Sequence, residues 1–206
     1  LDTVVPTVGS TTTPSVITPN GDRRSDTTSL GWSAGERVTG TGRILDKNGV
    51  TVRSWALAAG TSGATIWDGR DNAGKAAVDG RYVYRVAGFA PAGNATLRVL
   101  PMNVDRTIAS GGWWSSSFDP RAGQASRLSF RLIRSATVTV AIYQGTTLVR
   151  TIWTAKPLTA ATSGWTWDGK NGNGVLVKPG TYSVSVTASS WVATTKLTSP
   201  VTVRVH

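Results

Sequence analysis

Apolar and polar residues alternate at every second position along several short runs of the chain. The clearest runs are 128–132, 138–142, 182–186 and 201–205. In the first of them, Leu128, Phe130 and Leu132 are separated by Ser129 and Arg131. A period of two places one set of side chains in a core and the other in solvent, as on a half-buried strand. Since no segment has a clear helical period, the pattern predicts an all-β protein.

Turn-forming residues separate these runs. Asp, Asn, Gly and Pro gather at 46–49, 71–74, 171–174 and 179–180. These residue types favour the tight turns that join strands. Short strands joined by frequent turns, about seven strands in each 100 residues, predict a β-sandwich of the immunoglobulin-like type.

The chain repeats itself at a distance of 100 residues. Residues 67–86 read WDGRDNAGKAAVDGRYVYRV, and residues 167–186 read WDGKNGNGVLVKPGTYSVSV. This match has no gap, and weaker matches precede it, among them Val52-Arg53 with Val149-Arg150. Self-similarity at the length of a small domain indicates two copies of one structural unit.

We therefore predict two tandem immunoglobulin-like domains, at 15–108 and 109–206. Residues 1–14 are rich in Thr, Val and Pro and are expected to form an extended lead-in or linker. The small residues at 109–112 (ASGG) suggest a short connector between the domains. Each domain is long enough to bury a core of its own.

The W-D-G runs resemble a known family. Each repeat is similar to the Ig-like domain of the flagellar hook-capping protein FlgD, which has the pattern W-D-G-x-[DN]-x-x-G, a further Gly, and a Tyr-containing strand. The matching residues are Trp67, Asp68, Gly69 and Gly74 in the first repeat and Trp167, Asp168, Gly169 and Gly174 in the second. The resemblance implies the fold and leaves the role open, because such modules serve as spacers, anchors and binding appendages.

The start of each repeat follows the same family less closely. Residues 17–26 (ITPNGDRRSD) are similar to the S-P-N-G-D-G-x-x-D opening of these domains, but Arg23 stands where Gly is usual. The second repeat keeps only Phe118-Asp119-Pro120. The resemblance covers nearly the whole chain.

The composition argues against several kinds of covalent, metal-binding and catalytic chemistry. The chain has no Cys, which excludes disulfides, thiolate zinc sites and thiol nucleophiles. Its only His is the last residue, His206, and its only Glu is Glu36. Serine-type catalysis therefore lacks its usual base, and a glycosidase would need two acids across a cleft. We expect no catalytic residues and no cofactor.

Aspartates near the turns raise the question of calcium. The candidates are Asp22, Asp26, Asp68, Asp71 and Asp79. Calcium takes about six to eight oxygen ligands, usually with several carboxylates in one loop. The motif segment keeps only one Asp in the second repeat. We therefore expect Asp68 and Asp168 to accept backbone N–H bonds that fix the turn, and we expect no metal site.

Nine tryptophans supply the main candidates for binding. Trp67 and Trp167 lie in strand patterns and are expected in the cores. Trp113 and Trp114 are adjacent and face opposite ways on a strand, so at least one should leave its own core, to pack on the other domain or to bind. Trp191 is expected near a hairpin tip, where an exposed indole would stack on a sugar ring.

Positive charge is concentrated in the second repeat. The formal net charge is +11, and residues 109–206 hold 10 Lys/Arg against two acids. A basic surface attracts polyanions, although a general bias toward basic residues is an equal alternative. Arg127 and Arg131 lie opposite the apolar positions of their strand, where they either face solvent alone or contact wall phosphates. Without a known nucleic-acid motif, specific nucleic-acid binding is not expected.

These features predict a non-catalytic extracellular module that spaces, anchors or docks a larger bacterial secreted or surface protein. One alternative is an appendage of a secreted hydrolase that binds carbohydrate or a cell-wall polymer. Another is a structural subunit of a surface layer or filament. The partners would be a cell-wall polysaccharide or another anionic polymer, or neighbouring domains of the same full-length protein. The start at Leu1 suggests a processed or excised segment, and no run approaches the ~18 apolar residues of a membrane span.

Overall fold

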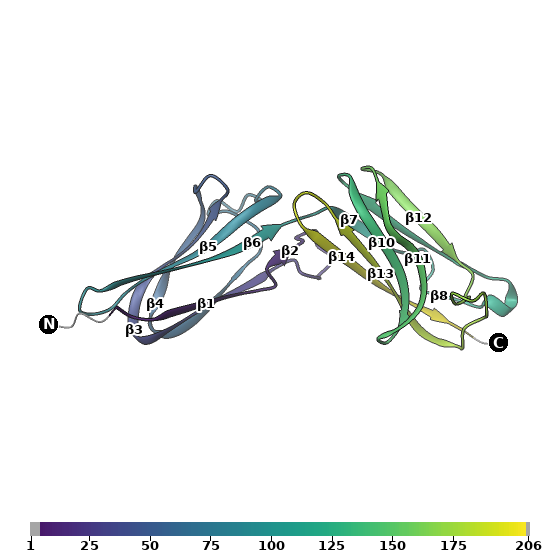
Figure 1. The fold of residues 1–206 in the computed structure, drawn as a ribbon, viewed down its shortest axis with the longest axis horizontal. Coiled ribbons are helices and arrows are strands. Elements are labelled where there is room, and N and C mark those ends of the chain that lie inside the picture. Colours follow the sequence, from purple (N-terminus) through teal and green to yellow (C-terminus); the bar gives the residue numbers. More distant parts are fainter. Residues whose placement is uncertain (1–4, 205–206) are drawn as a thin grey trace. The chain divides into compact units, whose positions relative to one another are not determined.

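The computed structural model describes residues 5–204, and the lone histidine, His206, lies outside them. The chain divides into two compact units, Leu1–Asp105 and Arg106–His206 (Figure 1). The described residues form strands, turns and one short 3₁₀ helix, η1, at Pro120–Ala122, with no α-helix. The predicted all-β, immunoglobulin-like sandwich class is confirmed.

The first unit contains six strands among its described residues. They are β1 (Val8–Thr13), β2 (Val16–Ile17), β3 (Thr28–Asp46), β4 (Thr51–Trp67), β5 (Gly80–Phe89) and β6 (Ala95–Val104). All pairs are antiparallel except β2 with β6. The strand order is β1-β3-β5-β6-β2, and β4 also pairs with β3.

The long strand β3 belongs to both layers of the first unit. Its first half pairs with β1, its second half pairs with β5, and β4 follows it along both halves. The register shifts between Ser33 and Val38, where the two halves meet. Such an irregularity bends a strand, and here it allows one strand to continue from one layer into the other.

The second unit has eight described strands, because the long strands are divided. They are β7 (Ile108–Trp113), β8 (Ser117–Phe118), β9 (Ser126–Leu132), β10 (Ala136–Gln144), β11 (Thr147–Leu158), β12 (Thr162–Trp167), β13 (Gly180–Ser189) and β14 (Thr194–Val203). Strands β9 and β10 correspond to β3, and β11 and β12 correspond to β4. The breaks produce two separate sheets, of order β11-β10-β13-β14-β8 and β12-β9-β7.

Each unit has its own hydrophobic core, built from the inward positions of the alternating strands. In the first unit Leu30 and Ile44 are fully buried, and in the second Leu128 and Ile142 occupy the equivalent places. Trp67 and Trp167, only 1% and 0% exposed, complete these cores. Their predicted burial is confirmed.

Two predictions about the connecting segments are wrong. Val8–Thr13, expected in a lead-in, is strand β1 of the first sheet, and Val8 is buried in the core. The residues expected as a connector, 109–112, belong to β7 and pair with β9. Small residues are needed there because a Cβ on Gly111 would lie 2.6 Å from Leu197 Cδ2. Close packing, and not flexibility, explains the composition.

Candidate functional site

The W-D-G loop is anchored by the tryptophan that opens it. Trp167 donates from Nε1 to the carbonyl oxygen of Lys170 at 2.9 Å, and its ring meets Tyr182 edge-on at 5.3 Å. Tyr182 in turn donates to the carbonyl oxygen of Lys178 at 2.6 Å. The same three interactions recur in the first unit, through Trp67, Arg70, Tyr82 and Val78. The predicted repeat therefore extends to individual atoms.

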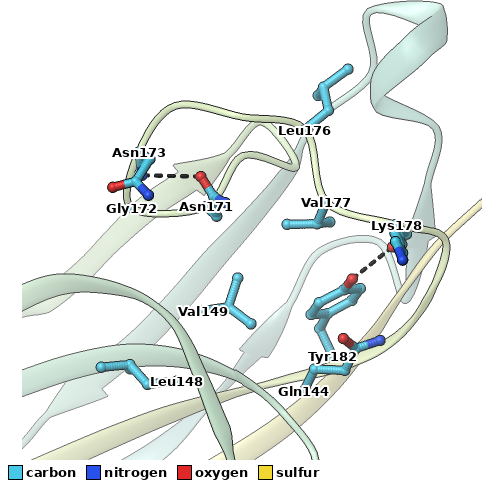
Figure 2. Close-up of a pocket in the computed structure, with 10 residues that line it drawn as sticks. All are labelled: Gln144, Leu148, Val149, Asn171, Gly172, Asn173, Leu176, Val177, Lys178 and Tyr182. Atoms are coloured by element: carbon cyan, nitrogen blue, oxygen red, sulfur yellow. Dashed lines mark hydrogen bonds between the residues drawn. The ribbon is translucent and has the colours of Figure 1, made fainter.

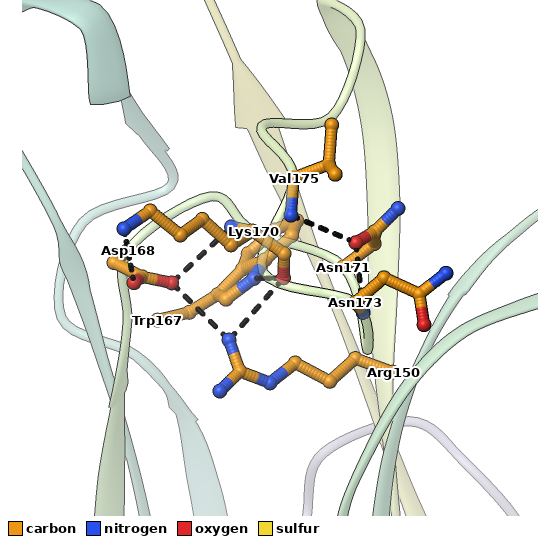
Figure 3. A network of polar contacts seen from close by, with 7 residues as sticks. All are labelled: Arg150, Trp167, Asp168, Lys170, Asn171, Asn173 and Val175. Atoms are coloured by element: carbon orange, nitrogen blue, oxygen red, sulfur yellow. Dashed lines mark hydrogen bonds and ion pairs between the residues drawn. The ribbon is translucent and has the colours of Figure 1, made fainter.

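Polar side chains cap the turn from within. Asp168 Oδ1 accepts from the Lys170 amide at 3.2 Å, and Asn171 Oδ1 accepts from the amides of Asn173 and Val175, both at 3.0 Å (Figure 3). In the first unit the same caps come from Asp68 and Asp71. The prediction that Asp68 and Asp168 fix the turn is confirmed. No group of metal-ligating His, Asp or Glu occurs in residues 5–204.

The first glycine of the motif is required by both conformation and space. Gly169 has φ +75°, and a Cβ there would lie 2.7 Å from the ring of Pro120. Gly69 has the same φ and would place a Cβ 2.9 Å from Pro19. The loop therefore packs directly on the proline of the opening segment in each unit. Sequence reasoning named these glycines and prolines separately, without their contact.

An arginine braces the outside of each loop. In the second unit Arg150 Nη1 lies 3.2 Å from Asp168 Oδ1 and 3.4 Å from the carbonyl oxygen of Lys170 (Figure 3). In the first unit Arg53 donates to the carbonyl oxygen of Asp71 at 3.0 Å. The repeat pairs Arg53 with Arg150, but the sequence analysis predicted no role for either arginine.

Beside each loop lies an open pocket, which the fold repeats. In the second unit it has a volume of about 480 Å³ and lies between the β10–β11 turn and the loop, with Gln144, Asn171 and Tyr182 among its lining residues (Figure 2). The equivalent pocket of the first unit measures about 460 Å³ and replaces two of these with Asp46 and Asp71. Because the shape persists while the charge changes, the pocket is a product of the loop geometry.

A second kind of surface forms on the outer face of the sheet β12-β9-β7. The central strand β9 buries Leu128, Phe130 and Leu132 and exposes Arg127 and Arg131, as its alternation predicts. Midway between the arginines lies Ser129, paired with Gly112 on one side and Gly164 on the other. Neither neighbour has a side chain, so the face is low at this point.

A depression of about 490 Å³ lies on this face. Its lining residues are Ser110, Gly111, Gly112, Trp113, Trp114, Ser129, Phe130, Arg131 and Thr162. Of the predicted binding residues, Trp113, Trp114 and Arg131 line it directly. Arg127 adjoins it, because its guanidinium lies over the Trp114 ring at 5.1 Å from the centroid. Four of the five predicted residues thus meet at one place.

Of the two adjacent tryptophans, one leaves the core, as predicted. Trp114 is 74% exposed, and its amide donates to the carbonyl oxygen of Arg127 at 2.8 Å. Trp113 is half-buried, packs near Trp167 and donates from Nε1 to the carbonyl oxygen of Ser199 at 3.1 Å. One indole therefore faces solvent, while the other supports the core.

Trp191 lies elsewhere. It is 79% exposed in the turn between β13 and β14, where the guanidinium of Arg134 lies 5.7 Å from its ring centroid. The hairpin-tip prediction is confirmed for this residue. It is not among the residues that line the depression, so a binding role for it stays a prediction.

Comparison with known proteins bears on the second unit. The family model described as FlgD Ig-like domain matches residues 115–191. The second unit is a FlgD-like Ig-type domain. No curated protein sequence matches the chain. In the described residues no helix is long and apolar enough to cross a membrane.

The solved structures that the chain matches include FlgD. FlgD from P. aeruginosa is 27% identical over 42% of this chain and 65% of that one, with a TM-score of 0.35. A tetra-tandem repeat from the extending region of a large adhesion protein is 16% identical over 97% and 49%, and a 1.5-MDa bacterial ice-binding adhesin is 18% identical over 98% and 65%, each with a TM-score of 0.35. The chain spans less than two thirds of each of these structures.

The departure from the FlgD-like opening pattern at Arg23 has a structural consequence. Asp26 accepts the amides of Asn20, Gly21 and Arg23 at 2.8–3.1 Å, which winds the segment into a tight loop. Within it Arg23 adopts φ +66°. This left-handed conformation favours Gly, which is why the usual residue there is glycine.

Proposed function

We propose that the chain is a non-catalytic immunoglobulin-like module of a bacterial secreted or surface protein, where it spaces, anchors or docks other parts of that protein. The observation that carries this proposal is the atomic repetition of the W-D-G loop. In both units the carboxylate and amide groups of the loop cap backbone amides. Groups held in this way stabilise a turn and are not disposed around a reacting atom.

A tandem of independently stabilised units suits a spacer. Each unit has a separate core and its own aromatic anchor, Trp67 or Trp167. The match to the FlgD Ig-like family supports the same interpretation, since modules of that fold are combined with many different partners. An extracellular location is part of the same proposal.

The test is single-molecule unfolding of the chain held between two marker domains. A spacer of two units should unfold in two separate events, each releasing roughly 30 nm, as expected for about 100 residues. Trp67→Ala and Trp167→Ala should each weaken only one of the two events. A single cooperative event that both substitutions weaken together would overturn the proposal. Antibody labelling of intact source cells, compared with lysed cells, tests the extracellular part.

The subunit alternative makes a different prediction. A layer or filament subunit pairs its edge strands with those of other copies. Sedimentation of the chain at rising concentration distinguishes the two, since a spacer stays monomeric and a layer subunit forms large assemblies.

A further inference from the structure

We propose that the outer face of the sheet β12-β9-β7 is a binding site for an anionic polysaccharide. The chain of sugars would lie in the depression over β7 and β9, with Trp114 as a stacking platform and with Arg127 and Arg131 as contacts for its acidic groups. This proposal does not depend on the spacer function, because a spacer need not bind and a binding module need not space.

The floor of the depression has the shape for an extended polyol. Ser129 stands between Gly112 and Gly164 on the two neighbouring strands, which leaves a low strip that opens over β7 and β9. On the β12 side, Arg127 Nε lies 3.6 Å from the position that a Cβ on Gly164 would take. Hydroxyl groups border the strip, from Ser110 and Thr162, both paired with Arg131. Hydroxyls both donate and accept hydrogen bonds, as sugar hydroxyls require.

Two cations flank this strip, one on each side of Ser129 along β9. Arg127 and Arg131 are four residues apart on one strand face, which places their Cα atoms about 13 Å apart. The only acids of the second unit lie in other places, with Asp119 at the N-cap of η1 and Asp168 beside Arg150. The field over the depression is therefore positive, and it suits carboxylate or phosphate groups carried along a polymer.

The stacking surface is held in place before a ligand arrives. The Arg127 guanidinium lies against the Trp114 ring, and the Trp114 amide is bonded to the Arg127 carbonyl oxygen. A ring fixed on both counts loses little entropy on binding, and an indole covers the apolar face of a sugar. The neighbouring guanidinium then lies close to an acidic substituent on a stacked sugar.

The same features favour a polysaccharide over a nucleic acid. Nucleic-acid binding relies on many cations that follow the phosphate backbone and on several aromatic platforms. This face offers two arginines and one exposed indole, bordered by hydroxyls. Preference for DNA is therefore a result that would contradict the proposal.

The experiment is calorimetric titration of the full chain with three anionic polysaccharides, polygalacturonate, hyaluronate and alginate. Dextran serves as the neutral probe and a DNA duplex as the competing polyanion. We expect saturable binding to at least one anionic carbohydrate polymer, with weaker binding to dextran and DNA. Part of the affinity should survive high salt, because stacking on Trp114 is not screened while the arginine contacts are.

Three variants test the site itself. Trp114→Ala and the double change Arg127→Gln with Arg131→Gln should each weaken binding about tenfold. Ser129→Phe should abolish it by filling the strip, and the chain should still fold because an aromatic ring packs well over glycine neighbours. Matched controls are Phe89→Ala, an exposed aromatic ring of the first unit, and Arg121→Gln, an exposed arginine outside the depression.

Each outcome of these experiments either supports or overturns the proposal. Loss of binding in the three site variants, with unchanged controls and unchanged thermal unfolding, supports the proposal. Equal weakening by Arg121→Gln, complete loss of binding in salt for every polyanion, or a preference for DNA would overturn it, as would failure to bind any of the three polymers. None of these results alters the number of unfolding events, so the spacer proposal is judged separately.

Discussion

Trp167 donates from its indole Nε1 to the carbonyl oxygen of Lys170, three residues later in the same loop, at a distance of 2.9 Å. The ring is fully buried while its polar edge holds an exposed turn. One side chain therefore connects the core of the second unit to the loop that packs on its opening segment. Trp67 and Arg70 have the same relationship in the first unit, at 2.7 Å.

Removing this side chain should be costly. We expect Trp167→Ala to lower the free energy of unfolding by about 3–5 kcal/mol, as for other core aromatics. Trp167→Phe keeps most of the apolar volume and loses the hydrogen bond, so it should cost less. Urea denaturation measures both, with Trp191→Ala as the exposed control expected within about 0.5 kcal/mol of the parent. A cost below about 1 kcal/mol for Trp167→Ala would contradict the anchoring role.

Two glycines of the same loop allow the stability cost of a left-handed backbone conformation to be measured apart from the cost of a close contact. Gly174 has φ +77° with open space around it, whereas Gly169 combines φ +75° with the close approach to Pro120. Gly174→Ala should therefore cost only the left-handed penalty, about 1 kcal/mol. Gly169→Ala should cost at least about 1 kcal/mol more, because the ring of Pro120 must move. Equal losses in urea denaturation would show that the contact with Pro120 is unimportant.

The features that follow from local sequence patterns could be predicted. Alternation in 128–132 places Arg127 and Arg131 in solvent, and the ungapped repeat predicts equivalent loops at Trp67 and Trp167. Both follow from periods of a few residues or from direct self-similarity. Adjacency on a strand likewise predicts that Trp113 and Trp114 point in opposite directions.

The depression could not be predicted from the sequence, because it depends on pairing between strands. Gly112, Ser129 and Gly164 come from three segments, and only the register of β7, β9 and β12 brings them into one row. The same limit explains the error at 109–112. In the sequence alone, a run of small residues indicates a flexible connector. In the structure, pairing with β9 and the close approach of Leu197 require small residues at these positions.

Arg23 provides a test of the unusual opening loop. Since Arg23 has φ +66°, Arg23→Gly relieves the left-handed strain while adding flexibility to the unfolded chain, and these effects should nearly cancel. Arg23→Val should destabilise by more than about 1 kcal/mol, because a β-branched residue is poorly tolerated there. At Arg43, an exposed position in β3, the order should reverse, with Val tolerated and Gly costly. Thermal unfolding of the four variants measures both orders.

Alkaline pH should destabilise the first unit through one buried phenol. Burial raises the pKa of Tyr84 to about 12, from an ordinary value of 10. Between these values the unfolded chain loses the proton and the folded chain keeps it. The contribution of Tyr84 is therefore fully present below pH 10 and is lost as the pH rises toward 12, in total about 2–3 kcal/mol.

Tyr84→Phe should remove this dependence and raise the free energy of unfolding near neutral pH by about 1 kcal/mol, because the buried Tyr84 hydroxyl has no hydrogen-bond partner among residues 5–204 and its desolvation is uncompensated. The second unit has Val184 at the equivalent position, so the effect belongs to the first unit. Burial also raises the pKa of Tyr182. Since Tyr182 is present in the parent chain and in the Tyr84→Phe variant, its contribution cancels when their free energies of unfolding are compared. Urea denaturation at pH 8, 10 and 11.5 should show a difference that grows in favour of Tyr84→Phe only above pH 10. Tyr143→Phe, at a partly exposed position, is the control, and a difference that stays constant across this range would contradict the assignment.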